Sequence, residues 1–231
     1  MRPPAPGTIE VHLVRPDDVP AALTDRYLDS AERERAAAFR FPEHADQWKR
    51  FRTALRTTLA GYLGCDPQDV ALATGEHGKP MLPLSPSLHF NLTHTRDLAL
   101  IAISTDGPVG IDVEPTSRAR DLPECASSFC HPAELAALPL ELDARQADLL
   151  RIWTAKEAGA KAAGTGFSVS PCDLQVTTDS VIDATGREWP LIRLEHPGLS
   201  GHLAHLCALQ KPAAVRILDR PAAYRMTART S

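Results

Sequence analysis

Apolar positions in the first quarter of the chain recur at helical spacing. They fall three or four residues apart, the interval that gives a helix one apolar face, at Trp48, Phe51, Leu55 and Leu59. A charged stretch precedes them, and Gly61 and Gly64 follow, as glycines do where helices end. The pattern predicts helices over residues 29–63.

The pattern changes to short apolar runs in the middle of the chain. Residues 75–87 are rich in Gly, Pro and Ser, which predicts a loop. The apolar runs that follow predict three strands, over residues 89–95, 98–104 and 109–113. The Asp106-Gly107 pair between the last two runs predicts a hairpin turn at that point.

Helix and strand signals return in the same order in the second half. His131-Pro132 places a proline in the first turn of a helix. A longer helix is expected over residues 143–163, with Gly164 just beyond its end. Four more strands are then predicted, over residues 173–177, 191–195, 203–209 and 215–218.

This order of elements predicts the fold class. Helices followed by strands, twice over, indicate an α+β protein. The 231 residues suffice for one large domain or for two small lobes that share a core. Because Gly107-Pro108 lies near the middle, we expect two α/β lobes of similar size, over residues 1–106 and 107–231. No sequence repeat marks them.

Composition and charge exclude several classes of function. The chain carries 25 Lys and Arg against 29 Asp and Glu, a formal charge of −4, which provides no broad basic face for a nucleic acid duplex. Its longest apolar run, residues 98–103, is far shorter than the roughly 20 residues of a membrane helix. Prolines occupy the N-terminus where a secretory peptide is apolar, so a cytoplasmic protein is expected. Five cysteines, an odd number, favour free thiols.

The segment GIDVE, residues 110–114, is the first in which chemistry outweighs packing. Side chains alternate along a strand, so Asp112 and Glu114 share one face while Ile111 and Val113 take the other. Their α-carbons lie roughly 7 Å apart, which lets two carboxylates approach one cation. Apolar neighbours indicate an interior strand, where two like charges are costly without a positive ion. The alternative is an edge strand with a solvated acidic face.

A second constellation lies in WTAKEAGAKAAGTGF, residues 153–167. On a helix Glu157 and Lys161 are four residues apart and face the same direction, with Trp153 one turn earlier. A carboxylate and an ammonium therefore stand side by side. The alternative is an exposed ion pair on the helix surface, worth about 0.2–0.5 kcal/mol.

A set of cations and hydroxyls precedes both segments. Lys79 lies in the GKP of the predicted loop, and His94 follows a strand between the hydroxyls of Thr93 and Thr95. A cation, an imidazole and hydroxyls near strand ends suit a ligand that carries phosphate. Further upstream a basic stripe at helical spacing is expected to face water, and the alternative is contact with another phosphate; its members are Lys49, Arg52 and Arg56.

Four motifs occur together in a fixed order. They are GKP at residues 78–80, FNLTHT at 90–95, GIDVE at 110–114 and W-x-x-K-E-x-x-x-K at 153–161. With these motifs at these separations the chain resembles the Sfp-type phosphopantetheinyl transferases, over residues 35–209. The resemblance implies two similar α/β lobes related by a pseudo-twofold, with coenzyme A bound in the cleft between them.

The resemblance also implies a reaction. Phosphopantetheine moves from coenzyme A to a serine of an acyl or peptidyl carrier protein, and 3′,5′-ADP is released. Mg²⁺ would be bound by Asp112, Glu114 and Glu157. Glu157 would accept the serine proton, and Lys161 would donate towards the departing phosphate. Coenzyme A would contact Lys79, Pro80, Thr93, His94 and Asp112, with Lys156 and Lys161 beside its pyrophosphate.

The chain departs from the family pattern in two places. Thr93 stands where a serine is usual, and it keeps the hydroxyl. Gln47 stands where many members carry an arginine that meets the 3′-phosphate of the coenzyme, a contact for which Lys49 or Arg50 is the expected substitute. By analogy a carrier protein would dock along residues 127–140, where Phe129 and Leu135 would offer apolar surface.

Two other functions fit the same residues. A metal-dependent phosphohydrolase acting on a nucleotide would use the same acids and lysines. A non-catalytic module would only bind coenzyme A or a carrier protein, although the presence of Glu157 and Lys161 argues against it. No nucleic acid or membrane partner is expected, and two lobes in one chain favour a monomer.

Overall fold

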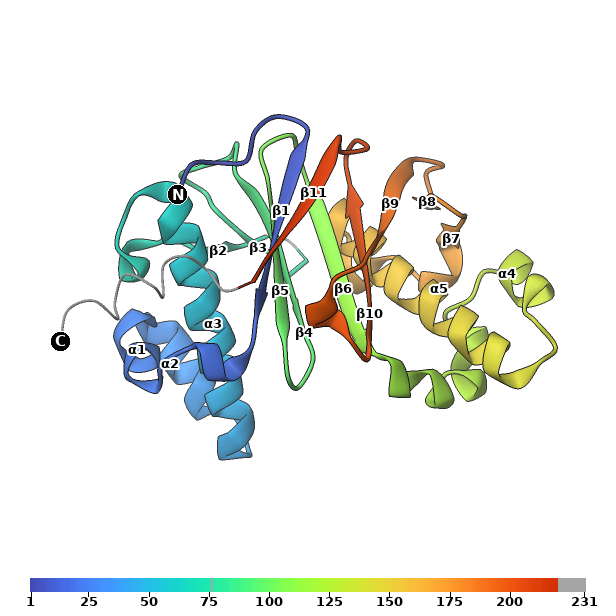
Figure 1. Cartoon of the computed structure of the whole chain (residues 1–231), viewed down its shortest axis with the longest axis horizontal. Helices are drawn as coiled ribbons and strands as arrows, with labels where there is room; N and C mark the ends of the chain where they lie inside the picture. The colour runs from blue at the N-terminus through green and yellow to red at the C-terminus, as the bar shows by residue number, and fades with distance from the viewer. Residues whose placement is uncertain (76, 220–231) are drawn as a thin grey trace.

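Two β-sheets packed face to face form the centre of the molecule, and helices cover their outer faces (Figure 1). The structure is a computed structural model, and it describes residues 1–75 and 77–219. Its mixture of sheets and helices confirms the predicted α+β class. No helix among the described residues is long and apolar enough to cross a membrane.

The first sheet has the strand order β11-β1-β5-β4. Its strands are β1 (Thr8–Val14), β4 (His89–His94), β5 (Ala99–Ser104) and β11 (Ala214–Asp219). β11 pairs in parallel with β1, so a strand from the C-terminal half completes the sheet of the N-terminal half. The lobe boundary between residues 106 and 107 stays a prediction, and residues 220–231 of the second lobe lie outside the described residues.

The second sheet has the strand order β6-β10-β9-β8-β7. Its strands are β6 (Val109–Pro115), β7 (Gln175–Val176), β8 (Ser180–Ile182), β9 (Glu188–Leu194) and β10 (His202–Ala208). The sequence pattern predicted neither β8 nor β1 of the first sheet. A separate ribbon of β2 (Ala73–Thr74) and β3 (Pro80–Met81) also lies partly in the segment that was expected to be a loop.

The hairpin predicted at Asp106-Gly107 is wrong. β5 pairs with β1 and β4, whereas β6 enters the second sheet and pairs with β10. The turn joins the two sheets instead. Gly107 has a φ of 134°, and a Cβ there would lie 2.5 Å from the Leu209 side chain. The turn signal was therefore sound, but the pairing partners of β5 and β6 depend on distant strands.

Most helices lie in the predicted segments, but the first helix, over residues 21–27, was not predicted. α1 (Ala21–Tyr27), α2 (Ser30–Ala37) and α3 (Pro42–Leu63) cover the first sheet, and α4 (Pro132–Ala137) and α5 (Leu142–Ala163) lie on the side of the second (Figure 1). Gly64 and Gly164 end α3 and α5 in the left-handed conformation, with φ of 70° and 74°, which glycine adopts without a steric penalty.

The basic stripe on α3 does not face water as expected. Arg56 is only 1% exposed, and its guanidinium lies 2.6 Å from Glu32 Oε2 and 2.5 Å from Asp29 Oδ2. Arg52 pairs with the same glutamate. The expectation rested on charge alone, whereas the carboxylates at the start of α2 lie against this side of α3 and bury the guanidinium of Arg56.

The packing between the sheets determines which way β6 faces. Its apolar side chains Ile111 and Val113 are buried among those of β1, β5 and β10. Because side chains alternate along a strand, Asp112 and Glu114 turn to the opposite face, towards α5. At Gly110 the two backbones touch: a Cβ there would lie 2.1 Å from the carbonyl oxygen of Ala158. This close approach places α5 directly over Asp112.

Candidate active site

Asp112 lies at the centre of a polar contact between β6, β4 and α5. Its side chain is buried, with 4% of the residue exposed. Oδ1 accepts a hydrogen bond from Lys161 Nζ at 2.6 Å and another from Thr93 Oγ1 at 3.1 Å. Asn91, also on β4, accepts from the backbone N–H of Ile111 at 2.9 Å. The FNLTHT, GIDVE and helix motifs therefore meet around one carboxylate.

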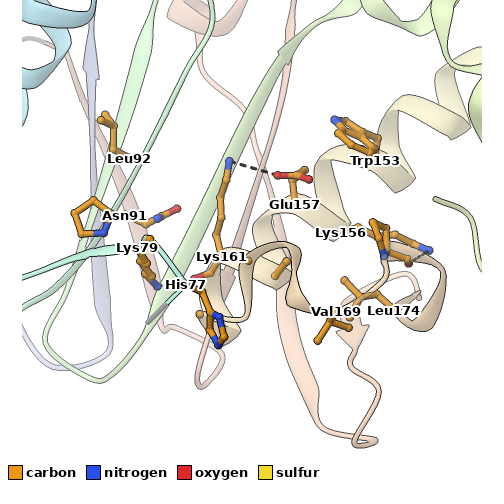
Figure 2. A pocket seen from close by; sticks show the side chains of 16 residues that line it. His77, Lys79, Asn91, Leu92, Trp153, Lys156, Glu157, Lys161, Val169 and Leu174 are labelled. Carbon is orange, nitrogen blue, oxygen red and sulfur yellow. Dashed lines mark hydrogen bonds and ion pairs between the residues drawn. The ribbon is translucent and has the colours of Figure 1, made fainter. Parts of the chain in front are cut away.

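Glu157 and Lys161 point towards one another from successive turns of α5 (Figure 2). Lys161 Nζ lies 3.9 Å from Glu157 Oε2, so the ammonium lies between Glu157 and Asp112. Burial raises the pKa of Glu157 above its ordinary value, the charge of Lys161 opposes this rise, and the charges of Asp112 and Glu114 add to it. Glu157 is therefore a better proton acceptor than a solvated glutamate.

Asp112 has a second oxygen, Oδ2, that is buried without a hydrogen-bond partner. A buried carboxylate oxygen in this state is costly, and its chemistry is that of a ligand for a hard cation such as Mg²⁺. The donor set of Asp112, Glu114 and Glu157, called the carboxylate trio below, fits such an ion. As arranged in the described part of the chain, however, no three Asp, Glu, His or Cys side chains can hold a metal together.

Glu114 has partners of its own beside the other two carboxylates. Arg118, in the 3-10 turn η3 (Thr116–Asp121), forms an ion pair with Glu114 Oε1. Trp153 Nε1 donates to the same oxygen at 3.1 Å, and the Arg118 guanidinium lies 5.0 Å from the centre of the Trp153 ring. Two side-chain cations, Lys161 and Arg118, therefore offset the charge of the carboxylate trio.

A cavity of about 260 Å³ opens beside Glu157 and Lys161 (Figure 2). One part of its wall is apolar and comes from α5, β4 and the segment after α5; it includes Leu92, Ala160, Val169 and Leu174. The polar part of the wall includes His77, Lys79 and Asn91. A narrow ligand with a polar end near Glu157 fits a cavity whose wall is apolar in one part and polar in the other.

Lys79 joins the β2–β3 ribbon to the end of α5. Its ammonium donates to the carbonyl oxygens of Lys161 at 2.5 Å and of Val109 at 3.0 Å. Burial lowers the pKa of Lys79 to about 8. Pro80 follows it at the start of β3 and also lines the cavity. The contacts of Lys79 and Pro80 with coenzyme A stay predictions.

Lys156 lies in the cavity wall but is almost fully buried, with 2% of the residue exposed. Its ammonium lies 2.6 Å from Glu134 Oε2 and donates to the carbonyl oxygens of Phe129 at 2.8 Å and Pro171 at 3.0 Å. Burial lowers the pKa of Lys156, and Glu134 opposes the shift. With three oxygen partners Lys156 supports the wall, and its expected place beside a pyrophosphate stays untested.

His94 stands at the edge of the site, on the last residue of β4. Its ring stacks on Phe51 of α3 with the ring centres 5.1 Å apart. Burial lowers the pKa of His94, so the imidazole is neutral near pH 7. A neutral imidazole can donate a hydrogen bond to an oxygen of a phosphate ester without adding a positive charge to the site.

The side chains expected near a 3′-phosphate have partners within the protein. Gln47 Nε2 donates to the carbonyl oxygen of Thr95 at 3.3 Å and thereby holds the β4–β5 turn. Lys49 pairs with Asp25 at 3.2 Å. Arg50 lies 2.7 Å from an Asp46 oxygen and donates to backbone carbonyls before α1. A phosphate contact by Lys49 or Arg50 would have to replace these bonds.

The expectation that Phe129 offers apolar surface to a carrier protein is wrong. Phe129 is 1% exposed and packs edge-on against Trp153, with ring centres 5.3 Å apart. Burial follows from its position under α5, a tertiary contact that its local sequence does not reveal. The large apolar side chains exposed in the neighbouring segment are those of Leu140 and Leu142.

Comparisons with known proteins agree with this arrangement. The family model of the 4′-phosphopantetheinyl transferase superfamily matches residues 108–208, which contain β6, α5 and β10. The 4′-phosphopantetheinyl transferase HetI of Nostoc sp. (strain PCC 7120) is 38% identical over 197 residues, which are 80% of this chain and 82% of HetI. The chain belongs to the 4′-phosphopantetheinyl transferase superfamily.

Other transferases are similar over shorter lengths. The 4′-phosphopantetheinyl transferase Sfp of Bacillus subtilis (strain 168) is 31% identical to this transferase over 158 residues, 63% of this chain and 69% of Sfp. The 4′-phosphopantetheinyl transferase AcpT of Salmonella typhi is 34% identical over 129 residues, 48% of this chain and 66% of AcpT. The predicted resemblance and the predicted enzyme class are confirmed.

Sequence reasoning missed two polar residues around the site of this transferase. Arg118 lies four residues after Glu114. That spacing brings the two side chains together only because the backbone turns after β6, and the sequence did not predict this turn. Glu134 pairs with Lys156 from a different helix, 22 residues earlier in the chain, and no local pattern marks that contact. Both contacts join separate elements.

Proposed function

We propose that this transferase moves the 4′-phosphopantetheine group of coenzyme A onto a serine hydroxyl of an apo acyl or peptidyl carrier protein. The reaction is magnesium-dependent and releases 3′,5′-ADP. The observation that carries the proposal is the meeting of Glu157 and Lys161 with buried Asp112 beside the cavity, with Lys161 Nζ 2.6 Å from Asp112 Oδ1. The names of the similar transferases support it.

Each reacting atom has a candidate partner in this arrangement. The serine oxygen forms a bond to the phosphorus that carries pantetheine, and the bond from that phosphorus to the bridging oxygen breaks. Glu157 accepts the serine proton, directly or through water. Lys161 donates to the departing phosphate and offsets its charge.

The residues that would hold Mg²⁺ are the carboxylate trio. When bound, the ion supplies positive charge that offsets the diphosphate and the leaving group. The unpartnered Oδ2 of Asp112 supports this assignment from the protein side. Thr93 donates to the other oxygen of Asp112 and thereby orients the carboxylate.

Coenzyme A occupies the cavity and the surface beside it in this proposal. Its pantetheine arm lies along the apolar wall of α5, near Ala160 and Val169. Its diphosphate lies at Lys161 and Asp112, with Lys156 behind it, and its adenosine end lies towards Lys79, Pro80, Thr93 and His94. The site is then a cleft between two α/β lobes related by a pseudo-twofold.

The setting of the reaction is also part of the proposal. The transferase acts as a monomer in the cytoplasm, where its partners are coenzyme A and a carrier protein. Nucleic acid and membranes are not partners, which agrees with the formal charge of −4 over the chain.

Intact-mass analysis of a carrier protein tests the proposal. Apo carrier proteins are incubated with the transferase, coenzyme A and Mg²⁺, and the carrier mass should rise by one phosphopantetheine group. Glu157→Gln should slow the transfer at least about 100-fold, whereas Glu188→Gln, the same change at an exposed position of β9, should leave it unchanged. Absence of any mass change over several carriers would defeat the proposal, and consumption of coenzyme A alone would indicate a phosphohydrolase.

A further inference from the structure

Two side-chain cations offset part of the charge of the carboxylate trio, and each contacts different members of it. Lys161 lies between Asp112 and Glu157 on the side of the cavity. Arg118 contacts only Glu114 among the three carboxylates. The Arg118 contact therefore involves one of the three proposed metal ligands. A substitution of Arg118 removes this contact and leaves Lys161, the lysine of the proposed reaction, in place.

Two donors engage the same oxygen of Glu114. Oε1 receives both the Arg118 guanidinium and the Trp153 N–H. A charge-assisted bond to arginine competes with metal ligation through Oε1 and holds the carboxylate in its present orientation. This engagement agrees with the finding that no three potential metal-ligating side chains stand together among residues 1–75 and 77–219.

Asp112 supplies the independent sign that a cation belongs here. Its Oδ2 is buried and unpartnered although Lys161 and Thr93 both bond to Oδ1. The two side-chain cations therefore leave this buried oxygen of Asp112 unsatisfied. A further cation would satisfy it.

We propose that Arg118 keeps Glu114 away from the metal position in the free enzyme, so that metal binding is an exchange in which Glu114 leaves Arg118 and joins Asp112 and Glu157. The inference rests on the proposed function, because the ion concerned is the magnesium of that reaction. Arg118 acts as a positioning residue: it sets the affinity for the ion through Glu114 and touches neither substrate nor reacting atoms.

Trp153 makes the exchange visible. Its Nε1–H is bonded to Glu114, and its ring lies 5.0 Å from the Arg118 guanidinium. The cation–π contact gives the guanidinium a place to remain after Glu114 has left. Departure of Glu114 removes a hydrogen-bond acceptor from the indole, which changes its emission.

The experiment is a Mg²⁺ titration with coenzyme A present and no carrier protein, followed by calorimetry and by tryptophan fluorescence. Arg118→Gln should lower the Kd for Mg²⁺ about fivefold, the factor that corresponds to about 1 kcal/mol for a partly exposed ion pair. Arg120→Gln removes the same charge two residues away, from an exposed side chain, and should change the Kd less than twofold. The emission change should disappear in Trp153→Phe.

Each outcome decides the inference. A Kd that is unchanged or higher in Arg118→Gln overturns it, as does saturation with Mg²⁺ that leaves the emission of Trp153 unchanged or a wild type that binds no Mg²⁺. The far-ultraviolet circular dichroism of each variant verifies its fold. Transfer to a carrier protein is a separate readout: its failure refutes the proposed function, whereas active transfer with an unaltered Kd in the variant refutes only this inference.

Discussion

Replacing Gly110 by alanine tests how the backbone assembles the site. A Cβ at this position would lie 2.1 Å from the carbonyl oxygen of Ala158 and 2.2 Å from the backbone nitrogen of Ala162. Ordinary contact begins at 3.4 Å, so β6 and α5 must separate by about 1.3 Å, the difference between 3.4 and 2.1 Å. Both atoms belong to backbone, and no side-chain rotation relieves the clash.

The separation acts directly on the charged groups. Asp112 lies two residues along β6, and Lys161 Nζ is 2.6 Å from its Oδ1. Moving α5 by more than 1 Å breaks this bond and moves Glu157 as well. A misplacement of that size costs about 100-fold in rate. Overpacking of a core costs about 1–3 kcal/mol, which lowers the Tm of a chain of this length by roughly 3–10 °C.

Intact-mass assays of transfer and thermal unfolding measure the two effects. Gly61→Ala is the matched control, because it adds the same methyl group to helix α3, where the nearest atom is the terminal carbon of the flexible Met1 side chain at 2.3 Å. That side chain is able to shift, so transfer should stay within about twofold of wild type. A Gly110→Ala enzyme with wild-type transfer and wild-type Tm would refute the account of the close backbone contact.

Three further changes test other parts of the structure. Lys161→Met should lower the turnover number of transfer about 100-fold with less effect on the KM for coenzyme A, measured by steady-state kinetics; a change in KM alone would contradict its role at the leaving group. Arg56→Met should cost about 1–3 kcal/mol in urea unfolding because buried Glu32 loses one of its two arginine partners and the buried carbonyl oxygen of Val70 loses its donor, whereas Lys49→Met should cost less than about 1 kcal/mol, and equal losses would refute the buried pairing. Burial lowers the pKa of both His12 and His205 from 6.5 to about 4; the unfolded chain therefore binds more protons between these values, and each imidazole should remove about 3 kcal/mol of stability as the pH falls from 6.5 to 4. Urea unfolding at a series of pH values should show this slope, shallower in His205→Gln, and an identical slope in that variant would contradict the assignment.

Local patterns predicted well which side chains share a face within a single element. Alternation along GIDVE placed Asp112 and Glu114 on the same face, and the structure turns that face towards α5. The four-residue spacing on α5 placed Glu157 beside Lys161, and their atoms lie 3.9 Å apart. Both predictions need only the periodicity of a strand or a helix, which the sequence states directly.

Contacts between distant elements were beyond such patterns. The Asp106-Gly107 turn was visible, but whether β6 pairs with β5 or with β10 depends on strands about 90 residues further along the chain. Arg56 was expected in water because its partners, Asp29 and Glu32, come from another helix. Burial of Phe129 likewise depends on Trp153, far along the chain. In each case tertiary packing decided what local sequence left open.

The parallel pairing of β1 with β11 constrains the order in which the chain folds. Glu10 and Arg216 meet at 3.3 Å although they are 206 positions apart in the sequence. During synthesis β1 leaves the ribosome early, yet one of its edges stays without a neighbour until β11 has also emerged. Closing a contact over so long a loop is slow. The first sheet is therefore completed last, and its open edge is the part of the nascent chain most exposed to wrong pairing.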